Sequence, residues 1–226
     1  MAKATLPAAT LAGAAYERLR ADLLACRLPP GAPIKINELS TTLATNPIAI
    51  REALSRLTAE GLVVAEPQKG FRAAPISPED LRDLTWVRIE IEGLCLKSAM
   101  AHGGMEWETN IVAALHRLQR TNLRDEDDAG LISDGWVCAH MQFHAALTRG
   151  CPNQLLRDIR AQLYARAERY LKLSVPLDDR NRDLIHEHSE LAALVLARDE
   201  AGALKAMADH LQTTTDILLH TPFLAA

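Results

Sequence analysis

Four of the eight histidines in this 226-residue chain have spacings typical of metal ligands. His140 and His144 are four residues apart, so on a helix they project from one face. His188 and His210 each lie among apolar residues at helical spacing, which directs them toward a core. Neutral imidazoles that converge from several helices would hold Zn, Ni or a similar divalent ion. The alternative is a set of core histidines that are satisfied by the backbone or by one another.

Arg88 is a second residue of chemical interest, because it interrupts an apolar stripe of its predicted helix. A buried guanidinium group needs a partner. One candidate is Glu92, one turn further on, in an ordinary i, i+4 ion pair. The other is the carboxylate of a ligand bound beside the metal.

The histidine pair has the spacing of a metalloprotease motif but lacks the residue that would do the chemistry. In the stretch HMQFH at 140–144, Met141 stands where H-E-x-x-H has its catalytic Glu. The chain also offers no serine-centred elbow, cysteine–histidine pairing or phosphate loop. We therefore expect that the protein is not an enzyme, although a metalloenzyme is the reading that competes with a binding protein.

The charge of the chain is divided unequally. The first 75 residues carry nine Lys and Arg against six Asp and Glu, whereas the rest carry 16 against 23, within a net charge of −4. A basic first third on an acidic body is expected when one small domain meets a polyanion. The sequence has no apolar run long enough for a membrane span and no secretory signal. Its four cysteines are widely spaced, as in proteins of a reducing cytosol. We therefore predict a soluble, cytoplasmic protein.

The first third predicts three helices and a hairpin. Apolar residues recur at helical spacing over 11–26, a short helix follows Asn37, and Asn46 caps a third helix over 47–61 that starts with a proline. The hairpin has extended pieces at 62–64 and 71–73. This order of elements is that of a winged helix-turn-helix.

The remainder predicts helices only. Prolines mark a boundary at which Ser77 can cap the next helix, so we predict a winged helix-turn-helix domain over 8–75, a linker over 76–78 and a helical domain over 79–222. The fold class is mainly α, with the N-terminal winged helix-turn-helix followed by an all-helical antiparallel bundle. The predicted helices of the bundle are 79–101, 106–123, 130–149, 153–174, 180–198 and 200–219.

Several motifs resemble those of one family. In the first third they are YERLR at 16–20, LPPG at 28–31 and IREALSRL at 50–57. They are similar to the DNA-binding domain of GntR-type bacterial transcriptional regulators. The second half resembles the helical FCD effector domain of the FadR branch of these regulators. The matching residues there are Arg88, Glu92, Phe143, His144, Asn153, Leu156, Glu187, His188, His210 and Leu211.

The resemblance implies a ligand-responsive regulator that binds a duplex DNA operator as a homodimer. It implies a divalent metal, Zn or Ni, on the four histidines, although the family usually carries Asp at the position of His140. It also implies a small carboxylate effector near Arg88, Glu92 and Asn153, and so favours the ligand over the ion pair for Arg88. The alternative is that the metal itself is the effector.

The predicted recognition helix supplies the DNA contacts. Arg51 and Ser55 lie on its outward face, where an arginine fork suits guanine. Arg56 and the wing residues Lys69 and Arg72 suit phosphates. We add Asn46 to the expected DNA-binding residues, and the simpler alternative is a set of solvated surface side chains. Since Pro47 and Asn37 stand where relatives usually have arginine, the operator sequence cannot be carried over from them.

Overall fold

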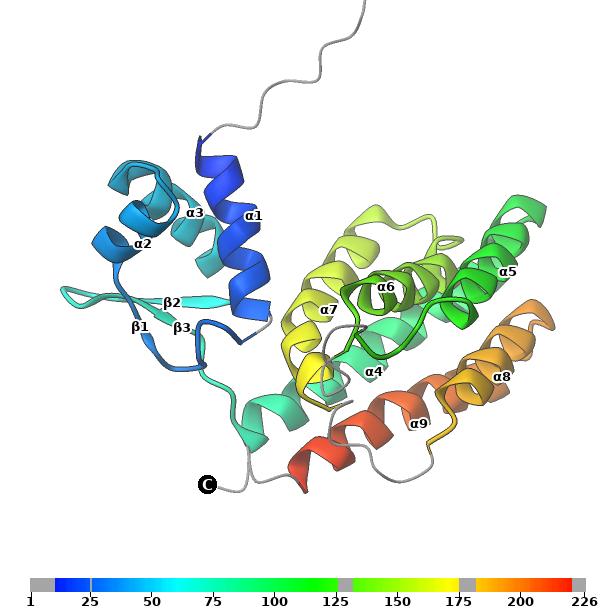
Figure 1. The fold of residues 1–226 in the computed structure, drawn as a ribbon. Coiled ribbons are helices and arrows are strands. Elements are labelled where there is room, and N and C mark those ends of the chain that lie inside the picture. The colour runs from blue at the N-terminus through cyan, green and yellow to red at the C-terminus, as the bar shows by residue number, and fades with distance from the viewer. Residues whose placement is uncertain (1–10, 25, 126–131, 175–181, 221–226) are drawn as a thin grey trace, which may run out of the picture. The chain divides into compact units, whose positions relative to one another are not determined.

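The chain divides into two compact units, one up to Ile76 and one from Ser77. The computed structural model describes residues 11–24, 26–125, 132–174 and 182–220. Each unit has its own apolar core. Figure 1 shows the helices and strands of both.

The first unit is a three-helix domain with a small antiparallel sheet (Figure 1). Its elements are α1 (Leu11–Leu24), β1 (Pro33–Ile34), α2 (Ile36–Thr42), α3 (Pro47–Ala59), β2 (Val63–Glu66) and β3 (Gly70–Ala73). The sheet order is β1-β3-β2, so the hairpin of β2 and β3 forms the wing and β1 adds a short third strand. At the hairpin tip Gly70 has a φ of 94°, a left-handed conformation that glycine adopts without strain.

The apolar stripe of α3 fixes which side of that helix faces outward. Ile50, Leu54 and Leu57 are fully buried and pack with Leu19 of α1. The Asn46 side chain accepts a hydrogen bond from the Ala49 N–H at 2.8 Å, which satisfies one of the free donors at the start of the helix. The opposite side of α3 is therefore left to solvent.

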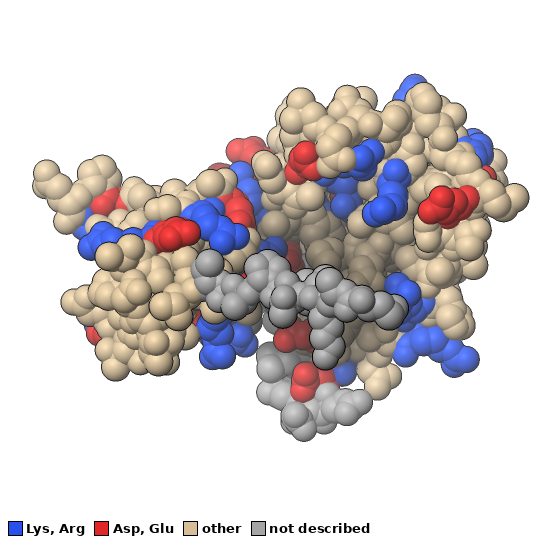
Figure 2. All heavy atoms as spheres, turned by 90° about the horizontal axis from the view of Figure 1, so that it is seen from above, with Lys and Arg blue, Asp and Glu red and all other residues tan. Residues whose placement is uncertain are grey.

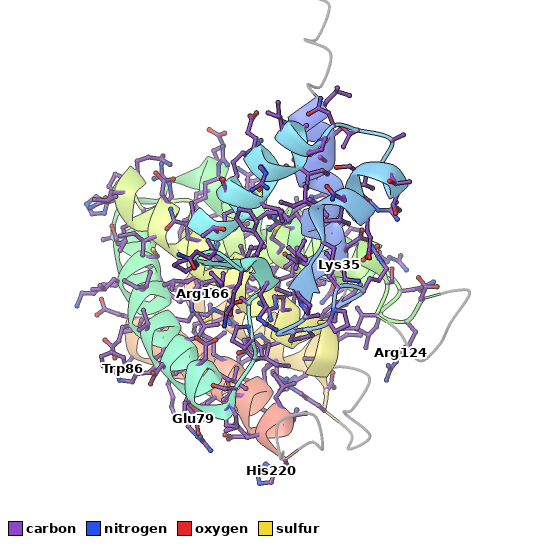
Figure 3. All side chains as sticks on the ribbon, turned by 90° about the vertical axis from the view of Figure 1, so that its left-hand side faces the viewer. Lys35, Glu79, Trp86, Arg124, Arg166 and His220 are labelled. Carbon is purple, nitrogen blue, oxygen red and sulfur yellow. The ribbon has the colours of Figure 1, made fainter. Side chains whose placement is uncertain are left out.

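The second unit is a bundle of helices. Its elements are α4 (Pro78–His102), α5 (Met105–Gln119), α6 (Asp134–Thr148), α7 (Gln154–Ser174), α8 (Leu184–Leu196) and α9 (Glu200–Leu219). α4 lies against both α7 and α9, α5 packs with α6, and α8 packs with α9, while α4 with α6, α5 with α8 and α7 with α9 make smaller contacts. Large buried side chains such as Phe143, Leu191 and Met207 fill its core. Trp86 is an exception, since it is 67% exposed and points outward from α4 (Figure 3).

The predicted fold class is confirmed, and both predicted caps are present. Asn46 caps α3, and the Ser77 hydroxyl accepts from the Asp80 N–H at the start of α4. Within the described residues several predicted helices are one to four residues too long, α2 begins at Ile36 and not after Asn37, and β1 was not predicted at all. No helix in the described part of the chain is long and apolar enough to cross a membrane.

Parts of the sequence predictions lie outside the described residues. These are the outer ends of the predicted domains, residues 8–10 and 221–222, residue 25 of the first predicted helix, and the first residues of two other predicted helices, 130–131 and 180–181. The boundary between the two compact units falls within the segment 76–78.

Candidate functional site

The four predicted histidines meet inside the bundle. His140 and His144 come from α6, His188 from α8 and His210 from α9, and all four are buried. Each offers a ring nitrogen, and these nitrogens lie within 4.8 Å of one another. The Nε2 atoms of His140 and His144 are 3.1 Å apart. Residues up to 70 positions apart in the sequence thus form one cluster.

Glu187 orients one of these rings. Its Oε2 lies 2.8 Å from Nδ1 of His210, and its two carboxylate oxygens each accept a 2.7 Å hydrogen bond from Arg182. A carboxylate bound in this way can only accept, so Nδ1 of His210 carries the proton. The lone pair of the ring is then on Nε2. This is the arrangement by which a carboxylate orients a metal-binding histidine.

Two of the other rings, those of His188 and His140, are held by different partners, whereas Nδ1 of His144 is buried without a hydrogen-bond partner among the described residues. The backbone of Leu184 accepts a hydrogen bond from the ring of His188, whose Nε2 has no partner among the described residues. Nδ1 of His140 lies 2.9 Å from the hydroxyl of Tyr164 on α7. In each of these rings Nδ1 therefore faces a fixed partner, and Nε2 is left for the cluster.

Burial keeps the four imidazoles neutral. It lowers the pKa of His140 and His144 well below the ordinary 6.5, and neighbouring histidines lower it further. Burial also lowers the pKa of His188 to about 3 and lowers that of His210, although the Glu187 carboxylate opposes the shift at His210. Neutral imidazoles with free lone pairs are the form that binds metal ions.

The donor set fits a divalent transition metal. Two nitrogens bound to one ion at about 2.0–2.1 Å lie roughly 3.0–3.4 Å apart, and the His140–His144 distance of 3.1 Å falls in that range. The cluster as a whole spans up to 4.8 Å, so its outer rings would have to close by about an ångström to share the ion. Uncharged nitrogen ligands suit Zn, Ni, Co or Cu better than Mg or Ca, which prefer oxygen. His186, predicted to be a surface residue, is exposed and faces Glu190 instead of the cluster.

A cavity of about 30 Å³ adjoins the histidines. Its walls include His140, His144, His210, Tyr164 and Arg88. The Nε of Arg88 is buried and has no hydrogen-bond partner among the described residues, and burial lowers the pKa of this guanidinium group. Its guanidinium carbon lies 5.5 Å from the centre of the Tyr164 ring. The cavity therefore has a buried cation at one wall and the histidine cluster at another.

Glu92 does not pair with Arg88. Its Oε2 accepts a 2.8 Å hydrogen bond from Nε of Arg160 on α7, and both side chains are buried. The ion pair between Arg88 and Glu92 that the i, i+4 spacing allowed is thus not the contact that forms. Asn153 also lies away from the cavity walls, because its side chain caps α7 by accepting from the Leu156 N–H. Glu92 and Asn153 are therefore not positioned to touch a molecule in this cavity.

The exposed face of α3 carries the predicted base readers. Arg51 and Ser55 are both exposed on the helix side opposite the core. Arg56, predicted to contact phosphate, lies over the ring of Tyr16 on α1, with its guanidinium carbon 3.8 Å from the ring centre. Arg51 thus remains the arginine of α3 without an intramolecular contact among the described residues.

The wing residues differ from each other. Lys69 is exposed near the hairpin tip. Arg72 bonds within its own unit, to the carbonyl of Gly31 and, at 3.3 Å, to Glu66, so it holds the turn before β1 to the hairpin. On the face seen in Figure 2, Lys and Arg are interspersed with Asp and Glu, so basic side chains do not form a continuous patch there.

Sequence reasoning missed four residues that position the site. They are Arg182, Glu187 as a partner of His210, Tyr164 and Arg160. Glu187 directly precedes His188 but bonds to a different histidine, 23 positions away. The sequence offers one signal for such residues, which is a polar side chain inside an otherwise apolar helix face. Arg160 and Tyr164 are examples of it.

Comparisons with known proteins match both units. Residues 83–213 match the FCD domain, and residues 11–72 match the gntR family of bacterial regulatory proteins. The chain is 34% identical to the HTH-type transcriptional repressor GlaR of Escherichia coli K12, over 90% of this chain and 93% of that protein. It is 32% identical to the HTH-type transcriptional regulator BphR of Paraburkholderia xenovorans, over 92% and 85%.

Solved structures share the fold. E. coli McbR/YncC superposes with a TM-score of 0.73 at 21% identity, over 92% of this chain and 97% of that one. A GntR regulator from Rhodococcus sp. RHA1 gives a TM-score of 0.71 at 17% identity, over the same shares.

Proposed function

Because the chain belongs to the gntR family of bacterial regulatory proteins and carries an FCD domain, we propose that it is a ligand-responsive regulator whose helical unit binds a divalent metal and a small carboxylate. As a member of this family it is a DNA-binding transcriptional regulator, and its relatives are named as regulators. The observation that carries the proposal is the cluster of four buried, neutral histidines beside a buried arginine in one cavity.

The metal would be held by His144, His188 and His210, with His140 as the fourth ligand. Bound there, a divalent ion such as Zn or Ni would act as a Lewis acid that accepts an oxygen of a carboxylate or of water. His188→Ala should lose the metal and lower the melting temperature, since metal binding in a bundle core also stabilises the fold. His186→Ala, two residues away on the exposed side of α8, is the matched control. Full metal content in purified His188→Ala would disprove this site.

The effector would bind between the metal and Arg88. Its carboxylate would give the buried Nε of Arg88 the hydrogen-bond acceptor that the described residues do not supply. Thermal-shift screening of small carboxylic acids should find ligands that stabilise the wild type, by about 2.7 kcal/mol at 100 times their dissociation constant. Arg88→Leu should bind operator DNA yet fail to respond to an acid that releases the wild type. A fully responsive Arg88→Leu variant would exclude Arg88 from the effector site.

The winged unit would place α3 in the major groove of the operator. Arg51 would read a base and Lys69 a phosphate, while Asn46 is exposed at the start of α3 and Ser55 is exposed one turn beyond Arg51. Arg51→Ala should cost about 1–3 kcal/mol and relax specificity at one position of each half-site. Lys69→Ala should weaken binding to all sequences alike and reduce the salt dependence. Identical profiles for the two variants on matched and mismatched operators would refute these roles.

The regulator would act as a homodimer in the cytoplasm, because helix-turn-helix proteins commonly read two-fold operators. The exposed apolar side chains of Trp86, Leu94 and Leu155, on α4 and α7, are candidates for the contact between subunits. Sedimentation of the wild type and of Trp86→Lys would test both the dimer and its surface.

A second candidate is a metal-responsive regulator, with the metal itself as effector. Four neutral nitrogens can bind a borderline metal ion without a carboxylate from an effector, and this favours the alternative. Titrating operator binding with metal alone, and then with acids at saturating metal, distinguishes the two candidates.

A further inference from the structure

Ile48 is an apolar side chain that the fold leaves in solvent. It is the second residue of α3 and is 77% exposed, whereas Ile50 two positions later is fully buried. Asn46 and Pro47 fix the start of the helix, so the direction of Ile48 follows from the same register that buries Ile50. It contributes nothing to the core of its unit.

The neighbours of Ile48 on the exposed side of α3 are polar. Arg51 and Glu52 are three and four positions further on, so they share its face, and both are exposed. In helix-turn-helix proteins the first residues of the second helix contact base edges in the major groove. At this end α3 thus presents one branched apolar side chain beside an arginine.

We propose that Ile48 is a specificity-determining residue that contacts the 5-methyl group of a thymine in the operator. The inference rests on the proposed placement of α3 in the major groove. There, thymine alone presents a methyl group, whereas the other base edges present donors and acceptors that an isoleucine would desolvate without replacing a hydrogen bond. The thymine should lie next to the base pair that depends on Arg51, since the two side chains are less than one helical turn apart.

The test removes the methyl group from the DNA. The full-length protein is used to select its operator from random duplexes, and each dT of the selected site is then replaced by dU. Loss of one methyl contact is worth about 0.8 kcal/mol, which is about fourfold in Kd for each half-site. Ile48→Ala should abolish the difference between dT and dU at that position, while Ile48→Val retains most of it. Val64→Ala, which trims an exposed branched residue on β2, is the control and should respond as the wild type does.

The possible results separate this inference from the proposed function. A dU effect at one position per half-site that disappears in Ile48→Ala supports the contact. An equal dU effect in wild type and Ile48→Ala, or a selected operator with no thymine beside the Arg51-dependent pair, overturns it. If Arg51→Ala leaves sequence discrimination unchanged, the placement of α3 is wrong and the inference fails with it. All variants should keep the melting temperature of the wild type, since the altered side chains are exposed.

Discussion

Replacing Glu187 by Gln perturbs the proposed metal site without touching a ligand. The Glu187 carboxylate lies between Nδ1 of His210 and the guanidinium group of Arg182, at 2.7–2.8 Å from each. Gln has the same shape but no charge. It can still accept one hydrogen bond, so the His210 ring stays near its position while its basicity falls. The variant therefore isolates the electrostatic part of this contact.

The size of the effect follows from the pKa of Glu187. Burial would raise this pKa, but hydrogen bonds from His210 and Arg182 outweigh burial and lower it from 4.5 to about 2. A folded-state pKa below the ordinary one means that the carboxylate stabilises the fold above pH 4.5, and that this contribution is lost as the pH falls toward 2. With 28% of the side chain exposed, we expect Glu187→Gln to cost about 2 kcal/mol at pH 7. Metal affinity should fall about 10–100-fold.

Competition with a chromophoric chelator measures the metal affinity, and urea unfolding of metal-stripped protein measures the stability. Glu190→Gln is the matched control, because it removes the same charge from the same helix at a side chain that is 59% exposed. A Glu187→Gln variant with the metal affinity of the Glu190→Gln variant would refute the role assigned to Glu187.

Three further predictions follow from the geometry. Metal-stripped protein should lose stability as the pH falls below about 6.5, because the unfolded chain then binds protons that the folded chain does not. The loss should reach up to about 1.4 kcal/mol per pH unit for each low-pKa histidine. Midpoints of urea unfolding that do not change from pH 8 to pH 5 would contradict this. Glu92→Gln should cost about 3–5 kcal/mol of stability by leaving Arg160 buried and uncompensated, while elemental analysis of the folded protein still finds the metal. Arg56→Gln should cost about 0.5–1 kcal/mol through its contact with the Tyr16 ring, and an unchanged salt slope of DNA binding would separate this contact from a phosphate role.

Local signals in the sequence predicted most of the fold. Apolar periodicity identified the helices, and Asn46 and Ser77 identified two helix starts, because a cap depends on residues only three positions away. β1 could not be predicted in this way. It has only two residues, one of them Pro33, and it is a strand only because β3 pairs with it from 37 and 39 positions away.

The candidate site was predictable in its ligands but not in its surroundings. The inward faces of three helices placed the four histidines correctly in the core. The partner of Glu92 was not predictable, because Arg160 is 68 positions away and competes with the local i, i+4 partner Arg88. Which of two arginines binds a buried carboxylate is decided by how α4 and α7 pack, and periodicity carries no information about that.

The tautomers of the clustered histidines affect how fast the protein is degraded. Glu187 and Leu184 fix the ring protons of His210 and His188 on their outer sides, so these rings turn bare lone pairs toward two other imidazoles. Lone pairs that repel one another inside the bundle favour its brief opening, and proteases act on such opened states. A bound cation would remove the repulsion. On the proposed function we therefore expect the lifetime of this regulator to follow metal supply, so that starvation for the metal lowers its abundance even without a change in its synthesis.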